Sequence, residues 1–303
     1  MSARAQLTVV TPSYNQVDYI EDTLRSVRNQ TYRDIEHLVF DGGSDDGTVD
    51  VLRRFEEETA DDPHYTLEWV SEPDGGQSQA INKGFERASG DVVGWLNSDD
   101  VYFYRDTVER MVEAFEARPD VDVLYGDHVE IGRGGEIRRV RRALDWDYDR
   151  LRRSYSIPQP ATFFRDYVVA DRGLDTDLDF SMDLEYWLYL GQRYTFEHVP
   201  RLVAGNRMYP ENKRTAGDDA HAEESERVRR AYDGPERVPP ARRLGDVAEI
   251  LWTRLAATPR MLAFEGDEPF AFDASVPPRA ERLATQLDLR AFAGFLGSRI
   301  RSR

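Results

Sequence analysis

The sequence predicts an α/β protein with a mostly parallel central sheet flanked by helices. Apolar runs typical of strands occur at 7–11, 35–40, 67–70 and 92–96. Segments with apolar residues at helical spacing separate these runs, and this alternation is typical of parallel sheets that are covered on both faces. A chain of 303 residues is long enough to form one large α/β domain or two smaller lobes.

Each element in the first 100 residues has a recognisable boundary. Pro12 predicts the end of the first strand, because proline cannot donate to a sheet ladder. Apolar residues at helical spacing predict a helix at 18–30, a second from about Thr48, and a third that stops near Gly90.

Beyond residue 100 the regular alternation stops. We expect a helix at 108–115, two short strands at 121–125 and 128–131, a hairpin turn at 132–135, a strand at 161–164, a helix at 182–190 and one or two strands at 196–208. Charged residues dominate 215–243, which predicts a solvated helix or a linker. An amphipathic stretch then returns at 250–264.

The composition restricts the class of protein. The chain contains no cysteine, which excludes disulfides and thiolate metal sites, and no apolar run approaches the about 18 residues that span a bilayer. We therefore expect a soluble, cytoplasmic protein. The formal net charge of −17 disfavours a nucleic-acid partner. Only two of the 40 basic residues are lysines, and an acidic surface with so little lysine suggests a halophilic source, where salt screens the repulsion between carboxylates.

The loops that follow the first four strands indicate a functional site. These loops lie at 12–15, 41–44, 72–75 and 97–100, and in open α/β sheets ligands bind at the carboxyl ends of the strands. Two of them contain glycines that let the backbone approach a ligand. The fourth, Asn97-Ser98-Asp99-Asp100, offers oxygen ligands that suit a divalent cation such as Mg²⁺ or Mn²⁺.

The glycine-rich loop at 41–48 matches none of the common phosphate or calcium loops. It lacks the dinucleotide fingerprint, the lysine of a Walker loop and the ligand spacing of a calcium loop. We expect Asp45 or Asp46 to cap the helix that Thr48 begins. Asp41 ends a strand, so it is a candidate acceptor of hydrogen bonds from a base or a ribose.

Together these residues resemble the family 2 glycosyltransferases of the GT-A fold, from about residue 7 to residue 209. The matching segments are 10–15, 41–48, 71–78, 80–84 and 96–100. The resemblance implies a GT-A domain with a nucleotide-sugar-binding half at 1–100 and an acceptor-binding half at 101–214. A mainly helical C-terminal extension would follow at 215–303.

The resemblance also implies roles for individual residues. Those expected to bind the donor are Pro12, Tyr14, Asn15, Asp41, Asp74, Gln77, Asn82, Asn97 and Ser98. Asp99 is the expected metal ligand, because Asn97 stands where the family has the first acid of its Asp-x-Asp motif. Residues expected near the acceptor or the diphosphate are Gln159, Trp187 and Arg207.

Family members place the general base near the start of a helix, before a Trp-Leu pair, which here makes Asp183 the candidate. Met182 replaces an acid that the family often has beside the base. Glu185 is the alternative base, although a helix turns about 100° per residue and so directs it to a different face. Tyr209 stands where many members have a histidine two residues after Arg207.

The implied activity is inverting transfer of a sugar from a nucleotide-sugar, with a UDP-sugar as first choice, to a hydroxyl of a glycan or lipid-linked acceptor. Mn²⁺ or Mg²⁺ would assist, and the setting would be glycan biosynthesis. A catalytically inactive sugar-nucleotide-binding protein is one alternative. A nucleotidyltransferase is another, but it would need a basic glycine-rich loop in place of 12–15.

The C-terminal extension is a candidate for peripheral association with the inner face of a membrane or for homodimer formation. The acidic character of the whole chain disfavours an anionic bilayer. We therefore expect 250–264 to pack on the enzyme's own core or on a second subunit.

Overall fold

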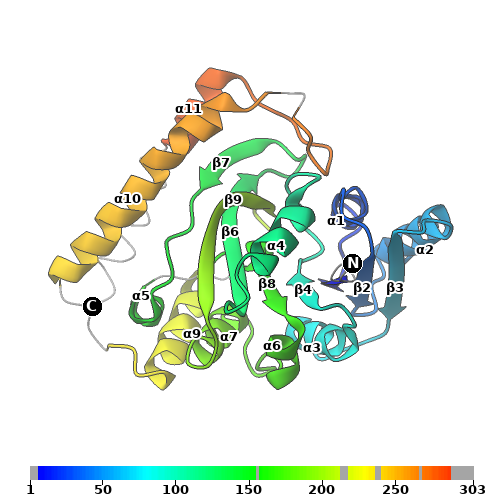
Figure 1. Ribbon diagram of the computed structural model, residues 1–303, viewed down its shortest axis with the longest axis horizontal. Helices are drawn as coiled ribbons and strands as arrows, with labels where there is room; N and C mark the ends of the chain where they lie inside the picture. The colour runs from blue at the N-terminus through cyan, green and yellow to red at the C-terminus, as the bar shows by residue number, and fades with distance from the viewer. Residues whose placement is uncertain (1–5, 155–156, 212–217, 236–239, 266–267, 288–303) are drawn as a thin grey trace.

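The computed structural model of the chain describes residues 6–154, 157–211, 218–235, 240–265 and 268–287. Its strands form one sheet with the order β3-β2-β1-β4-β8-β6-β9-β5, and β7 pairs with the outer part of β6. Figure 1 shows the sheet curling through the molecule with helices on both faces. The predicted α/β class with a flanked central sheet is therefore confirmed.

The first half of the sheet consists of four parallel strands. They are β1 (Leu7–Ser13), β2 (Ile35–Asp41), β3 (Tyr65–Ser71) and β4 (Val92–Trp95). The helices that connect them are α1 (Ile20–Arg28), α2 (Thr48–Thr59) and α3 (Gln77–Arg87), as the apolar spacing predicts. All four strands end at the same edge, because parallel strands share one direction.

The expected end of the first strand at Pro12 is wrong, since β1 continues to Ser13 in register with β2. β4 pairs with β1 only as far as Val10, and Leu96 then donates its N–H to the carbonyl of Val10. Pro12 lies beyond this pairing. Its lack of an N–H therefore interrupts no hydrogen bond between β1 and β4.

The second half of the sheet is mixed. β8 (Thr162–Arg165) runs antiparallel between β4 and β6 (Val123–Ile131), and β9 (Phe196–Arg207) runs parallel to β6. The two short strands expected at 121–125 and 128–131 are one strand. The register of β6 against β9 shifts at Asp127, which is where the apolar pattern of the sequence is interrupted.

The remaining elements complete the second half of the molecule. β5 (Val101–Tyr102) closes the sheet against β9, and β7 (Ile137–Arg141) forms the predicted hairpin with β6. The helices are α4 (Thr107–Glu116), α5 (Tyr148–Arg153), a 3₁₀ turn (Gln159–Ala161), α6 (Asp166–Asp171), α7 (Met182–Leu190), α9 (Asp218–Ala231), α10 (Pro240–Ala263) and α11 (Arg279–Gln286).

Separate apolar clusters cover the two faces of the sheet. One joins the buried sides of α1, α2 and α4, and the other joins those of α3, α5, α6, α7 and α9. A third cluster lies under α10, where Met261 and Phe264 meet Phe103 and Phe272. The inner side of the stretch at 250–264 thus packs on the enzyme's own core. No helix in the described part of the chain is long and apolar enough to cross a membrane.

Candidate active site

The loops that follow β1, β2 and β3 lie close together at one edge of the sheet. The Tyr14 side chain is 62% exposed and lies against Gly42. An added Cβ at Gly42 would be 3.2 Å from the Tyr14 ring and 3.3 Å from a carboxylate oxygen of Asp74. Glycine at this position therefore leaves room for an exposed aromatic face and a carboxylate side by side, which suits a flat polar ring such as a nucleotide base.

Hydrogen bonds join the loops after β1 and β2. The Asn15 amide N–H donates to the Ser44 hydroxyl (2.7 Å), and the Asp45 N–H donates to the Asn15 side chain (3.1 Å). Asp46 accepts from the N–H of Thr48, the first residue of α2, but the N-cap position is Gly47, so the predicted cap by Asp45 or Asp46 is wrong. Asn15 itself has a left-handed backbone (φ 52°), a conformation that asparagine tolerates better than most residues.

Asp41 is buried beneath these loops. Its carboxylate accepts hydrogen bonds from the N–H groups of Gly43 and Ser44 and from the hydroxyls of Ser44 and Ser71. It is 2% exposed. Asp41 thus holds the glycine-rich turn in place through these four hydrogen bonds.

Asn97 links the two halves of the molecule. Its side-chain oxygen accepts from Gln77 of α3 (3.0 Å) and from the Trp95 indole (2.9 Å), and its NH₂ group donates to the side chain of Gln159 (3.0 Å). Gln159 also donates to the carbonyl of Trp95 (2.7 Å). Gln77, Asn97 and Gln159, predicted separately for the donor and the acceptor side, therefore form one network.

Two adjacent acids follow this network. Asp99 is partly exposed and accepts a hydrogen bond from the Tyr209 hydroxyl (2.9 Å), whereas Asp100 is buried and accepts from the N–H of Arg207 (2.8 Å). Burial raises the pKa of both carboxyls, and the negative charge of Asp99 adds to the shift at Asp100. Burial and Asp99 likewise raise the pKa of the Tyr209 phenol, so Tyr209 stays a donor at neutral pH.

Arg207 is fully buried beneath these acids. Its guanidinium donates to the carbonyls of Asp99 (2.8 Å), Gly132 and Arg133 and forms an ion pair with Asp22 of α1 (2.7 Å). The structure thus places Arg207 in the scaffold, where it holds the backbone of the acidic loop.

Two further predicted residues also lie inside the protein. Asn82 exchanges a pair of hydrogen bonds with the backbone of Leu174, which docks α3 on the loop before α7. Trp187 is buried and stacks on Phe164 with ring centroids 5.7 Å apart. Pro12, near the end of β1, and Ser98, in the turn after β4, are buried as well.

Asp183 is the acid of α7 that reaches the surface. Of the nine residues of this helix, only Asp183 and Tyr189 are not buried. Glu185 is 7% exposed, pairs with Arg172 (2.6 Å) and accepts a hydrogen bond from Tyr232. Glu185 is therefore committed to packing α7 against its neighbours, whereas Asp183 has solvent access.

Helix α9 holds the backbone of the residues that directly precede α7 and Asp183. The sequence predicts only a solvated helix or a linker for this segment. Glu224 accepts from the N–H groups of Phe180 and Ser181 (both 2.7 Å) and of Asp179 (3.2 Å). Burial opposes ionisation of Glu224, but these amides and Arg227 outweigh it and lower its pKa. No local pattern singles out Glu224, because its partners lie more than 40 residues away.

The oxygen atoms around Asp99 fit a divalent cation that a substrate helps to bind. The described residues contain no group of three or more His, Asp or Glu side chains that could hold a metal on its own. Nucleotide-dependent enzymes commonly bind Mg²⁺ through one or two carboxylates together with substrate phosphates. The carboxylate of Asp99 meets this requirement, with the Tyr209 oxygen beside it.

The fold is that of GT-A-type glycosyltransferases. The structure matches that of a mannosyltransferase from Pyrobaculum calidifontis, solved with GDP-mannose and Mn²⁺, with a TM-score of 0.60 at 22% identity over 98% of this chain and 83% of that one. It matches S. aureus TarS, solved with UDP-GlcNAc, with a TM-score of 0.56 at 16% identity over 86% and 77% of the two chains.

The sequence comparisons are more specific. The model of glycosyl transferase family 2 matches residues 8–211, and the chain belongs to this family. An uncharacterized glycosyltransferase of Mycobacterium tuberculosis is 36% identical over 62% of this chain and 70% of its own length. A putative teichuronic acid biosynthesis glycosyltransferase of Bacillus subtilis, TuaG, is 39% identical over 35% of this chain and 40% of its own length.

Proposed function

We propose that this glycosyltransferase moves a sugar from a nucleotide-sugar to a hydroxyl of a glycan or lipid-linked acceptor, with inversion at the anomeric carbon. The observation that carries the proposal is the network of Gln77, Asn97 and Gln159, which joins the edge of the parallel strands to the second half of the sheet. We assign residues 1–100 to donor binding and 101–214 to acceptor binding.

The donor nucleotide is proposed to lie against Tyr14, Gly42 and Asp74. Asn15 would shape this surface through its bonds to the neighbouring loop, and Asp41 would act through the turn that it organises. A UDP-sugar is the first choice, supported by the UDP-GlcNAc bound to TarS, and the GDP-mannose of the archaeal neighbour makes GDP-sugars the next.

Asp183 is the proposed general base. It would accept the proton of the acceptor hydroxyl as that oxygen forms a bond to the anomeric carbon. The bond between the anomeric carbon and the phosphate oxygen breaks in the same step, and the nucleoside diphosphate leaves with the electron pair. The solvent access of Asp183 and the engagement of Glu185 support this choice of base.

Asp99 is the proposed ligand of Mn²⁺ or Mg²⁺, together with the donor diphosphate. A divalent cation bound there would neutralise charge on the leaving group. Tyr209 would orient the carboxylate through its hydroxyl, and Arg207 would hold the loop from beneath.

A nucleotide-binding protein without transferase activity is the second candidate. Two departures from the family pattern, Asn97 and Tyr209, favour it. The oxygen and the NH₂ group of the Asn97 side chain are both hydrogen-bonded within the protein, and the Tyr209 hydroxyl donates to Asp99.

Thermal stability against a panel of nucleoside diphosphates, with and without Mn²⁺, tests the donor proposal. A ligand at 100 times its dissociation constant adds about 2.7 kcal/mol to the free energy of unfolding. We expect one nucleotide to stabilise only with the metal, and Asp99→Ala to abolish the effect. If no nucleotide stabilises the folded protein, the donor site is wrong; if one does but no acceptor is glycosylated, the second candidate stands.

We also propose that the protein comes from a halophile and requires salt, since the chain has 57 acidic and only 40 basic residues. The melting temperature should rise between dilute and molar KCl. An unchanged melting temperature would contradict the proposal.

A further inference from the structure

Arg133 lies in the turn between β6 and β7, with Gly132 before it and Gly134 after it. Because glycine has no side chain, neither neighbour in the chain can block access to the arginine. The Arg133 side chain is 54% exposed, and its guanidinium lies over the ring of Tyr209, with Cζ 5.9 Å from the ring centroid. Arg133 is therefore an accessible cation beside the tyrosine that donates to Asp99.

The turn that carries Arg133 is fixed to the acidic loop. The carbonyl of Arg133 accepts a hydrogen bond from the buried guanidinium of Arg207 (2.7 Å), and the same guanidinium donates to the carbonyl of Asp99 (2.8 Å). A second connection runs through Tyr209, whose ring lies under the Arg133 guanidinium and whose hydroxyl donates to the Asp99 carboxylate (2.9 Å). The position of Arg133 relative to the candidate metal ligand is thus set by contacts on two sides.

The surroundings of Asp99 call for positive charge if a diphosphate is to bind there. Asp99 and Asp100 are adjacent acids, and the charge of Arg207 beneath them is paired with Asp22 (2.7 Å). A diphosphate brings further negative charge to this edge, so a cation beside the metal stabilises it. Arg133 is exposed and can supply this charge, whereas Arg207 is fully buried.

In the structure Arg133 is paired with a side chain that it can exchange. One of its terminal nitrogens lies 2.5 Å from a carboxylate oxygen of Glu211, whose side chain is 66% exposed. Exposed pairs of this kind contribute little to stability, because water competes for both partners. A diphosphate carries more charge and offers several oxygens to the planar fork of the guanidinium, so it is the stronger partner.

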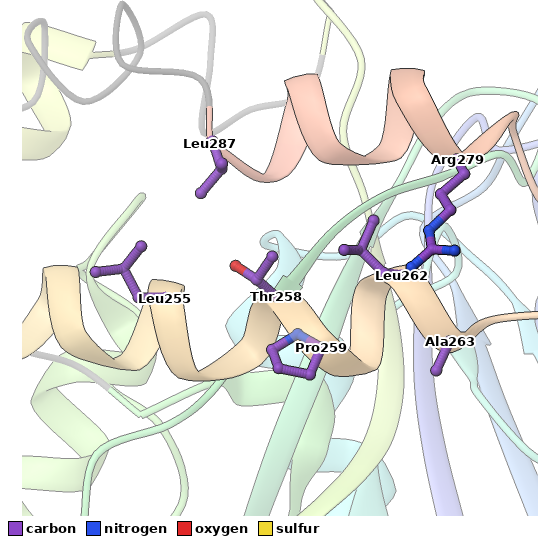
Figure 2. Close-up of a pocket in the computed structure, with 7 residues that line it drawn as sticks. All are labelled: Leu255, Thr258, Pro259, Leu262, Ala263, Arg279 and Leu287. Atoms are coloured by element: carbon purple, nitrogen blue, oxygen red, sulfur yellow. The ribbon is translucent and has the colours of Figure 1, made fainter.

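A second arginine, beside a groove, lacks these features. Arg279 lies at one end of the groove between α10 and α11, which is otherwise lined largely by apolar side chains such as Leu255, Leu262 and Leu287 (Figure 2). No carboxylate is among the described residues that line this groove. Arg279 thus has no candidate metal ligand beside it, whereas Arg133 has Asp99.

We propose that Arg133 is a ligand of the donor diphosphate and exchanges Glu211 for it when the nucleotide binds. The inference rests on the proposed function, because it takes a nucleotide-sugar as the ligand and Asp99 as the residue beside its diphosphate. The guanidinium donates to phosphate oxygens and stabilises the charge that the nucleoside diphosphate carries as it leaves. Arg207, which the sequence suggests for this role, instead holds the turn of Arg133 from beneath.

Isothermal titration calorimetry with UDP and with UMP, each with Mn²⁺, tests the proposal. The titrations use the full chain at the lowest KCl concentration at which circular dichroism shows it folded, because salt screens the contact. Arg133→Gln should weaken UDP binding about tenfold or more and UMP binding much less, because the diphosphate offers more oxygens to the guanidinium. If the thermal-stability panel selects another base, its diphosphate and monophosphate replace UDP and UMP.

Two further variants test the exchange. Glu211→Gln removes the competing carboxylate and should raise the affinity for UDP about two- to fivefold. The same substitution combined with Arg133→Gln should give no gain, because the carboxylate acts through Arg133. Arg230→Gln is the matched control: Arg230 of α9 is 58% exposed and pairs at 2.5 Å with Glu226, which is 57% exposed, and its loss should leave UDP binding unchanged.

Three results would overturn the proposal while the proposed function stands. Equal UDP affinity in the wild type and Arg133→Gln would leave the pair with Glu211 as a surface contact only. An equal loss of UDP and UMP binding would exclude a specific contact with the diphosphate. A gain from Glu211→Gln that persists without Arg133 would exclude the exchange. If no nucleotide binds the wild type, the donor site itself is wrong, and the assignment of Arg133 falls with it.

Discussion

Residues 7–100 and the rest of the described chain contribute to one sheet but are assembled in different ways. In the first region β1 pairs with β2, and β2 with β3, each across one connecting helix, and β4 alone pairs with a strand distant in the chain, β1. In the second, β8 inserts between β4 and β6, which lie on either side of it in space but well before it in the chain.

This contrast extends to the candidate site. The donor edge consists of loops that follow their own strands, such as 41–48 after β2. The acceptor side depends on distant support, since α9 holds the approach to Asp183 through Glu224. Substitution of packing residues in the first region should therefore mainly lower stability, whereas substitution of the residues that hold Asp183 should mainly lower turnover.

Asp183→Asn should show the largest effect. A general base contributes about 10²–10⁴-fold, so the variant should retain at most a few per cent of wild-type turnover while nucleotide binding is unchanged. Initial rates with a saturating donor measure the effect. Asp177→Asn, at an exposed position upstream of α7, is the control and should remain active. Near-normal turnover in Asp183→Asn would remove this residue from the mechanism.

Gly84→Ala tests the packing of the donor region. A Cβ at Gly84 would overlap Cγ1 of Val10 on β1, and overpacking of this kind costs about 1–3 kcal/mol. Denaturant unfolding measures the change. Gly245→Ala in α10 is the matched control: among the described atoms outside the backbone of the helix, none lies within 4 Å of the added Cβ, so a gain of about 0.4–1 kcal/mol is expected. Equal behaviour of the two variants would contradict the difference in packing between the regions.

Glu224→Gln tests the support of Asp183. The amide group keeps one acceptor oxygen for three backbone N–H donors, so the start of α7 should lose its fixed position. We expect kcat to fall about tenfold with an unchanged dissociation constant for the donor. Arg227→Gln, an exposed partner of Glu224, should leave both constants unchanged. Parallel losses of kcat and donor affinity would indicate general unfolding instead.

The smallest effect concerns His198, which lies between Asp127 (2.8 Å) and Asp145 (3.1 Å). Burial lowers its pKa, but hydrogen bonds and charge from the two aspartates outweigh burial and raise it above the ordinary value. The protonated ring therefore stabilises the fold at low pH, and this contribution is lost as the pH rises through the folded-state pKa.

His198→Gln should accordingly lose more free energy of unfolding, relative to the wild type, at about pH 6 than at about pH 9. Chemical unfolding at the two pH values measures the difference. A larger loss at the higher pH would show that the neutral ring is the stabilising form.

The sequence alone predicts the first region well, because its apolar periodicity is local. Strand and helix follow each other within about 30 residues, and the carboxyl ends of parallel strands necessarily share an edge. The same logic places Asp99 and Asp74 at that edge and Asp183 at the start of a helix. The position of the β1 end was missed, because it depends on how far β4 pairs with β1.

Tertiary structure decides the properties that depend on distant partners. The sequence suggests Arg207 as a ligand of the acceptor or the diphosphate. In the structure its guanidinium is paired with Asp22 and hydrogen-bonded to three backbone carbonyls. The sequence suggests Asn97 as a donor-binding residue, and in the structure its side chain is hydrogen-bonded to Gln77 and Gln159. Which charged or amide group is buried and which remains accessible is set by residues up to 185 positions away, and local sequence patterns carry no record of those contacts.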